Sequence, residues 1–157
     1  MEEQKEKSSE PPPATCITIQ CGGAVDCTWL EKKVDATVAF LQLEAELSVC
    51  IVDDEAMATL HEKHSGVAGT TDVLTFEHDS DENKIDVDIA VCLDVAVRAA
   101  KDRDHSVESE LLLYIVHGIL HCTGFDDHND EDHARMHKEE DRVLQGIGVG
   151  AIWSNGS

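Results

Sequence analysis

Positive charge is scarce in this chain. Its 157 residues include 12 Lys and Arg against 33 Asp and Glu, so the formal net charge is −21. An acidic surface repels the phosphate backbone, and composition alone therefore argues against binding to nucleic acid.

Long apolar runs are also missing. No stretch approaches the roughly 20 consecutive apolar residues that span a bilayer. Residues 1–7 are mostly charged and lack the apolar centre of a secretory signal peptide. We therefore expect a cytoplasmic protein with no membrane partner.

Cysteine pairs with metal-binding or redox spacing are absent as well. The six cysteines form no C-x-x-C pair, and Cys50 and Cys92 lie in apolar runs, where a cysteine usually behaves as a small buried hydrophobe. A disulfide framework is unusual in a cytosolic protein of this size, so we expect six reduced thiols. Cys122 follows His121, and adjacent helical residues point about 100° apart, so Cys122 is expected to face the core.

The remaining sequence is long enough for one domain with a core. Residues 1–14 are charged and then Pro-rich, which predicts a disordered tail, and residues 147–157 are expected to form a loose C-terminal tail. Within 15–146, the spacing of apolar residues predicts four strands and about five helices. The strands are expected at 16–20, 47–52, 72–76 and 85–91, and the helices near 30–41, 57–60, 93–101, 108–122 and 130–145. This order indicates an α+β fold, with a mixed four-stranded sheet packed against the helices.

The helix predicted at 108–122 carries the strongest chemical signal. It is apolar over most of its circumference, which is typical of a buried helix, and it bears His117 and His121. Residues i and i+4 share one helix face, so the two imidazoles can bind one metal ion. Gly124 is suited to end the helix and turn the chain back, so that Asp127 or His128 supplies a third ligand.

The donor set favours one zinc ion per chain, with His117, His121 and Asp127 as ligands, His128 as the competing third ligand, and water in the fourth position. The spacing is that of the metzincin proteases. However, Gly118 stands where those enzymes carry their glutamate base, which disfavours a metallopeptidase.

Two other features near this motif have competing interpretations. His133 and His137 form a second i,i+4 pair, which is either a second metal site or a solvated face. Because no glycine turn follows and Arg135 and Lys138 flank the pair, we expect the solvated face. Asp126 is either an orienting partner for a ligating imidazole or a surface carboxylate.

The run from His117 to Asp126 resembles the signature of the YbeY family, bacterial endoribonucleases of ribosomal-RNA maturation. The family pattern is H-G-x-L-H-x-x-G-[YF]-D-H, and this chain reads His-Gly-Ile-Leu-His-Cys-Thr-Gly-Phe-Asp-Asp. The segment 71–76, Thr-Asp-Val-Leu-Thr-Phe, resembles the family strand T-D-V-L-S-F, and Asp88-Ile89 resembles its G-D-I segment. The resemblance covers about residues 45–145.

Three positions depart from that pattern. The usual third histidine ligand is Asp127 here, with His128 displaced by one residue. Ser65 stands where the family carries an arginine, to which the resemblance assigns a phosphate contact, and Val87 replaces a glycine.

The resemblance implies that residues 15–146 form a zinc-dependent, single-strand-specific endoribonuclease of ribosomal-RNA maturation, with His117, His121 and Asp127 as catalytic metal ligands. Its partners would be ribosomal RNA and proteins of the small ribosomal subunit, and we expect a monomer. Lys63, Arg98, Lys101 and Arg103 are the nearest candidates for phosphate contact. The alternative is a non-catalytic, zinc-stabilised ribosome-assembly factor whose acidic surface meets basic proteins.

Overall fold

The computed structural model describes residues 16–21, 25–81, 83–126 and 128–153. Five helices and four strands follow one another in these ranges. The strands are β1 (Cys16–Gln20), β2 (Glu44–Val52), β3 (Val73–Glu77) and β4 (Lys84–Cys92). The helices are α2 (Cys27–Phe40), α3 (Asp54–Ser65), α4 (Leu93–Arg103), α5 (Val107–Cys122) and α6 (Asp130–Gly146). The predicted α+β class and mixed four-stranded sheet are confirmed.

The sheet has the strand order β1-β2-β4-β3. β1, β2 and β4 are parallel, and β3 is antiparallel to β4. Because side chains alternate along a strand, the in-register pairs Leu47–Val87 and Val49–Ile89 lie on the same face and are fully buried there. This face supports the core.

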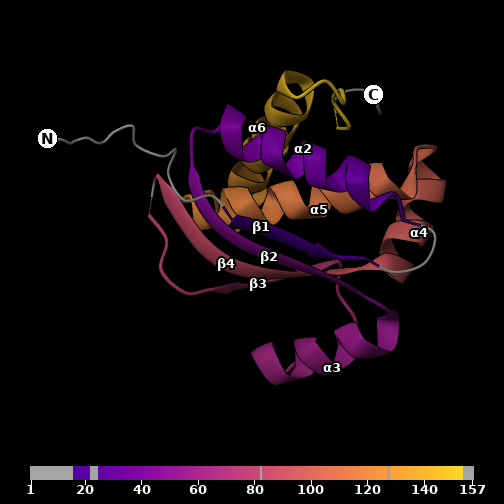
Figure 1. The fold of residues 1–157 in the computed structure, drawn as a ribbon. Coiled ribbons are helices and arrows are strands. Elements are labelled where there is room, and N and C mark those ends of the chain that lie inside the picture. The colour runs from indigo at the N-terminus through magenta and orange to yellow at the C-terminus, as the bar shows by residue number, and fades with distance from the viewer. Residues whose placement is uncertain (1–15, 22–24, 82, 127, 154–157) are drawn as a thin grey trace, which may run out of the picture.

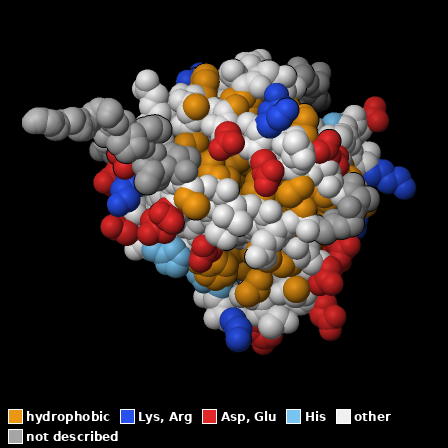
Figure 2. Space-filling view, viewed as in Figure 1, with side chains coloured by type: hydrophobic (Ala, Val, Ile, Leu, Met, Phe, Trp, Pro, Cys, Tyr) orange, Lys and Arg blue, Asp and Glu red, His pale blue; other side chains and the backbone are white. Residues whose placement is uncertain are grey.

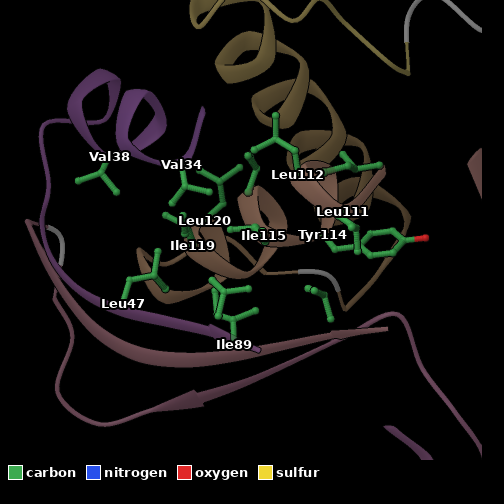
Figure 3. Close-up of a cluster of buried hydrophobic side chains, with 14 of the residues drawn as sticks. Val34, Val38, Leu47, Ile89, Leu111, Leu112, Tyr114, Ile115, Ile119 and Leu120 are labelled. Atoms are coloured by element: carbon green, nitrogen blue, oxygen red, sulfur yellow. The ribbon is translucent and has the colours of Figure 1, made fainter. Parts of the chain in front are cut away.

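α5 runs along that face as the central helix of the core, with α2 and α6 outside it (Figure 1). Leu111, Ile115 and Ile119 are fully buried, and the α5 side chains fill the space between the sheet and α2 (Figure 3). Each such large side chain contributes about 1.5–3 kcal/mol when removed from water. The sequence prediction that α5 is buried is confirmed.

The opposite face of the sheet carries only α3 among the described elements (Figure 1). Met57 of α3 packs there against Leu74, Ala90 and Cys92 in a small second cluster.

In the same view, acidic side chains are spread over the surface and basic ones are few (Figure 2). None of the described helices is long and apolar enough to cross a membrane.

The expectation that all six cysteines are reduced thiols is wrong for one pair. Cys21 and Cys27 form a disulfide that joins the end of β1 to the start of α2. Their Cα atoms are 6.0 Å apart, because α2 begins beside β1, where Cys27 Sγ also lies 3.8 Å from the Ile19 carbonyl oxygen. A six-residue separation carries no recognisable signal in the sequence. Cys16, Cys50, Cys92 and Cys122 are free thiols, and Cys92 and Cys122 are buried as expected.

Residues 147–153, which the sequence predicts to be part of a loose tail, pack against α6. Asp141 Oδ1 accepts hydrogen bonds from the backbone amides of Ile152 (2.7 Å) and Trp153 (3.0 Å), and Ala151 is buried. The chain turns back through Gly148 and Gly150, both at positive φ (86° and 101°). Glycine adopts this conformation at little cost, which lets so short a segment reverse.

Candidate metal centre

α5 holds His117 and His121 one turn apart on a well-capped helix. Ser106 Oγ accepts a hydrogen bond from the Ser109 amide at its start. At its end, the Gly124 amide donates to the His121 carbonyl and the Phe125 amide to the Leu120 carbonyl. Gly124 has φ of 112°. These two bonds form the turn in which a left-handed glycine ends a helix, as the sequence predicts, and α6 then returns along α5.

His117 is held from behind by a buried carboxylate. Its Nδ1 lies 2.7 Å from Glu140 Oε2, and Glu140, on α6, is only 1% exposed. Trp153 Nε1 donates to the other oxygen, Oε1, also at 2.7 Å. A carboxylate accepts hydrogen bonds, so the His117 proton belongs on Nδ1 in this contact, and Nε2 is the nitrogen through which the ring would bind a metal ion. Carboxylates orient histidine ligands in this way in many metal sites.

A pocket of about 300 Å³ opens beside His117. It is lined by Asp72, Val73, Arg103, Leu113, Tyr114, His117, His133, His137, Glu140 and Trp153. The α6 histidines therefore border the site instead of forming a separate solvated face. His137 is half-buried and stacks on Trp153, with ring centroids 3.7 Å apart, while His133 is exposed.

The two other predicted ligands that the structure describes, His121 and His128, are exposed. His121 is exposed at the last turn of α5, and Asp127 lies outside the described residues. His128 is exposed and forms a group with Asp126 and Asp132, whose ligand atoms all lie within 4.8 Å of one another. This group of one imidazole and two carboxylates is able to hold a metal ion, and it places Asp126 beside His128.

Arg98 and Arg103, two of the basic side chains expected to contact phosphate, make different contacts in the structure. Arg98 forms two hydrogen bonds with Asp54, at 2.8 and 3.1 Å, and thereby lowers the pKa of Asp54. Arg103 also pairs with a carboxylate, since its Nε lies 3.3 Å from Oε1 of the buried Glu110, but it stands in the wall of the His117 pocket, with its guanidinium 4.3 Å from the centre of the Trp153 ring. Of these two arginines, Arg103 is the one placed to meet a ligand of the site.

Ser65, at the position of the family arginine, serves the local backbone. Its hydroxyl donates to the His61 carbonyl at 2.8 Å and accepts from the Val67 amide at 3.2 Å. These contacts help to end α3 before Gly66, which has a left-handed φ of 77°. Ser65 therefore supplies no positive charge for phosphate.

Two neighbours of the histidines face the core and not the site. A Cβ added to Gly118 would lie 3.0 Å from both Ile89 Cδ1 and Thr75 Cγ2, so the position has no room for the glutamate base of a metallopeptidase. Cys122 is buried, and burial raises the pKa of its thiol to about 12. It is therefore a core residue, as expected.

The residues of the site fit a zinc ion. His117 meets Glu140 through Nδ1, so Nε2 is the nitrogen that a metal would use, His121 follows one turn later on the same helix, and the Gly124 turn is followed by a run of carboxylates and an imidazole. Imidazole and carboxylate donors are typical zinc ligands.

The sequence of this fold and site matches known proteins. A model of the endoribonuclease YbeY family matches residues 24–148. The chain belongs to this family. The relative from Symbiobacterium thermophilum, an endoribonuclease YbeY, is 34% identical over 76% of this chain and 82% of its own length. That from Staphylococcus epidermidis is 32% identical over 81% of this chain and 92% of its own length.

A solved structure agrees with the fold. The solution structure of a Thermotoga maritima protein aligns with a TM-score of 0.64 at 25% identity, covering 84% of this chain and 89% of that one. The shared name of the sequence relatives supports the predicted assignment of the chain as an endoribonuclease, a hydrolase of the nuclease class.

Glu140 and Trp153 are site residues that the sequence reasoning missed. Glu140 has a detectable signal, because it lies four residues from both Met136 and Leu144, which are fully buried on α6. A carboxylate at such a core position calls for a buried partner. Trp153 lies beyond the family match and carries no comparable signal.

Proposed function

We propose that this protein is a zinc-dependent endoribonuclease that cleaves single-stranded RNA during ribosomal-RNA maturation, with one zinc ion on His117, His121 and a third ligand after Gly124. The observation that carries this proposal is the His117–Glu140 contact, since it holds one imidazole nitrogen ready for a metal beside a pocket that contains Arg103. The family relatives named endoribonuclease supply the reaction class.

A bound zinc ion would supply Lewis acidity toward a phosphoryl oxygen and an activated water. The protein contributes orientation and charge. Glu140 fixes the His117 ring, and Arg103 offers a guanidinium at the pocket wall, where its fork of N–H donors suits a phosphate.

Zinc binding is tested first. Purified protein should bind one equivalent, and His117→Ala and His121→Ala should lose it, whereas His78→Ala, which changes an exposed histidine of the β3–β4 turn, should keep it. Full occupancy in both α5 variants would overturn the site. Asp127→Ala, His128→Ala and Asp132→Ala then decide the third ligand. Loss only in the first assigns Asp127, whereas joint loss in the other two assigns the Asp126–His128–Asp132 group.

Cleavage is tested on ribosomal-RNA precursor and on matched single-stranded and duplex RNA. The single strand should be cut, and chelation or His117→Ala should abolish cutting. Because phosphate contacts weaken steeply with salt and the chain carries a net charge of −21, cleavage of naked RNA should be stronger at low salt. Ser65→Arg should raise it, and Ser109→Arg, on another element, serves as the charge-matched control.

The second candidate is a zinc-stabilised, non-catalytic ribosome-assembly factor that binds basic proteins of the small subunit. The observation that favours it is Ser65, which uses its hydroxyl to end α3 and leaves no cation at the family arginine position. Complementation of a host that lacks its own copy of this protein distinguishes the two proposals. Restored ribosome maturation with His117→Ala supports the assembly factor, and restoration only by the natural sequence supports the nuclease.

A further inference from the structure

Trp153 lies outside the segment that matches the family, residues 24–148, yet it reaches the candidate site. Three hydrogen bonds tie its segment to two adjacent carboxylates of α6. Asp141 Oδ1 accepts from the amides of Ile152 and Trp153, and Glu140 Oε1 accepts from Trp153 Nε1 at 2.7 Å. The indole therefore has a fixed position relative to α6.

Two further side chains contact the indole ring. His137 stacks on it with a ring-plane angle of 8°, and the Arg103 guanidinium lies 4.3 Å from its centre. Stacking and cation–π contacts of this kind hold an aromatic ring in one orientation. The indole N–H consequently points at Glu140 Oε1 with little freedom to turn away.

Glu140 is 1% exposed and has one donor on each oxygen, Trp153 Nε1 on Oε1 and His117 Nδ1 on Oε2. A carboxyl group that is held at one oxygen has a fixed direction for the other. That direction sets the plane and tautomer of the His117 imidazole, and hence the nitrogen that is presented to a metal ion.

We propose that Trp153 is a positioning residue of the metal centre: it fixes the Glu140 carboxylate so that His117 keeps its proton on Nδ1 and its lone pair on Nε2. The proposal rests on the function proposed above for the identity of the metal. It gives residues 149–153, which lie beyond the family match, a part in metal binding that acts through Glu140.

Substitution of Glu140 by glutamine makes a sharp test. In Glu140→Gln the Trp153 N–H favours the amide oxygen at the Oε1 position, which turns the NH₂ group toward His117. Two donors cannot face each other, so the His117 proton should move to Nε2 and zinc affinity should fall about 100-fold. In the double variant with Trp153→Phe, the amide is able to rotate and offer its oxygen to His117.

We therefore expect Trp153→Phe to have opposite effects on zinc affinity in the natural sequence and in the Glu140→Gln variant. Trp153→Phe alone should weaken zinc binding about 10-fold, whereas the same change added to Glu140→Gln should restore part of the lost affinity. Losses that simply add would overturn the proposal. Trp29→Phe, at the only other tryptophan, is the matched control and should leave zinc affinity unchanged.

The tautomer is measured independently of the metal. The ¹⁵N shifts of the His117 ring in zinc-free protein should show Nδ1–H in the natural sequence and Nε2–H in Glu140→Gln. An unchanged tautomer in Glu140→Gln would overturn the positioning role even if zinc binds. If zinc fails to bind the natural protein while the tautomer switches as expected, the zinc proposal fails and the positioning of His117 stands.

The natural protein provides a further measurement if a variant does not fold. Of its two indole N–H resonances, that of Trp153 should shift when zinc is added, because it shares Glu140 with a zinc ligand, and that of Trp29 should not. Equal or absent shifts during saturable zinc binding would contradict the proposed connection.

Discussion

The two histidines of α5 stand one turn apart but have different surroundings. His117 is backed by a carboxylate that is almost fully buried and has a partner on each oxygen, whereas His121 is exposed at the last turn before Gly124. The first imidazole is therefore held by buried neighbours, whereas the second stands at the surface. Packing preforms the half of the site at His117, and the half at His121 lacks such enclosure.

The largest expected difference concerns the two alanine variants. Both His117→Ala and His121→Ala should reduce RNA cleavage at least about 100-fold, because each removes a proposed metal ligand. Only His117→Ala should also unfold more easily, by about 2 kcal/mol, since it removes one partner of the buried Glu140. Urea unfolding of the zinc-free variants measures this difference, and equal stabilities would contradict the contrast between the two positions.

The Gly118→Ala variant tests how closely α5 packs against the sheet next to His117. A Cβ there would lie 3.0 Å from two sheet side chains. Overpacking costs about 1–3 kcal/mol, and the better helix propensity of alanine returns about 1 kcal/mol. We expect Gly118→Ala to lower the free energy of unfolding by about 1 kcal/mol, and a gain in stability would show that the core yields at this point.

Cys122 follows the exposed His121, and its reactivity tests whether its side chain faces the core. Burial raises its thiol pKa to about 12, so it should resist alkylation at pH 8 in the native protein and react on unfolding. Cys122→Ala should keep its zinc, because the side chain faces the core. Mass spectrometry after alkylation without reductant should find four modified thiols in the unfolded chain, and six would exclude the Cys21–Cys27 disulfide.

The smallest effect is expected at an exposed histidine–carboxylate pair. His78 Nε2 lies 3.0 Å from Asp88, with the two side chains 52% and 56% exposed. This hydrogen bond raises the pKa of His78 above its ordinary value of 6.5. The contribution to stability is therefore full below pH 6.5 and disappears as pH rises through the raised pKa. His78→Asn should lose a little stability at pH 5.5 and none at pH 9, and a loss independent of pH would assign the effect to packing.

The comparison of the two α5 histidines also shows which part of the site the sequence predicts. The i,i+4 spacing and the glycine turn are local, so they are legible along the chain and the structure confirms both. The Glu140 contact joins residues 23 positions apart. It depends on the angle at which α6 returns along α5, and spacing does not contain that angle.

The order and type of the elements, the burial of α5, the mixed sheet and the family can be predicted from the residues, because periodicity, caps and motif residues act over a few positions at a time. Other features arise only when the chain folds. Residues 147–153 pack onto Asp141, His137 and Arg103 meet the Trp153 ring, and Cys21 and Cys27 form a disulfide. Each of these contacts depends on how whole helices pack and where the chain reverses. In such places, neighbours that are remote in sequence set the direction of a side chain.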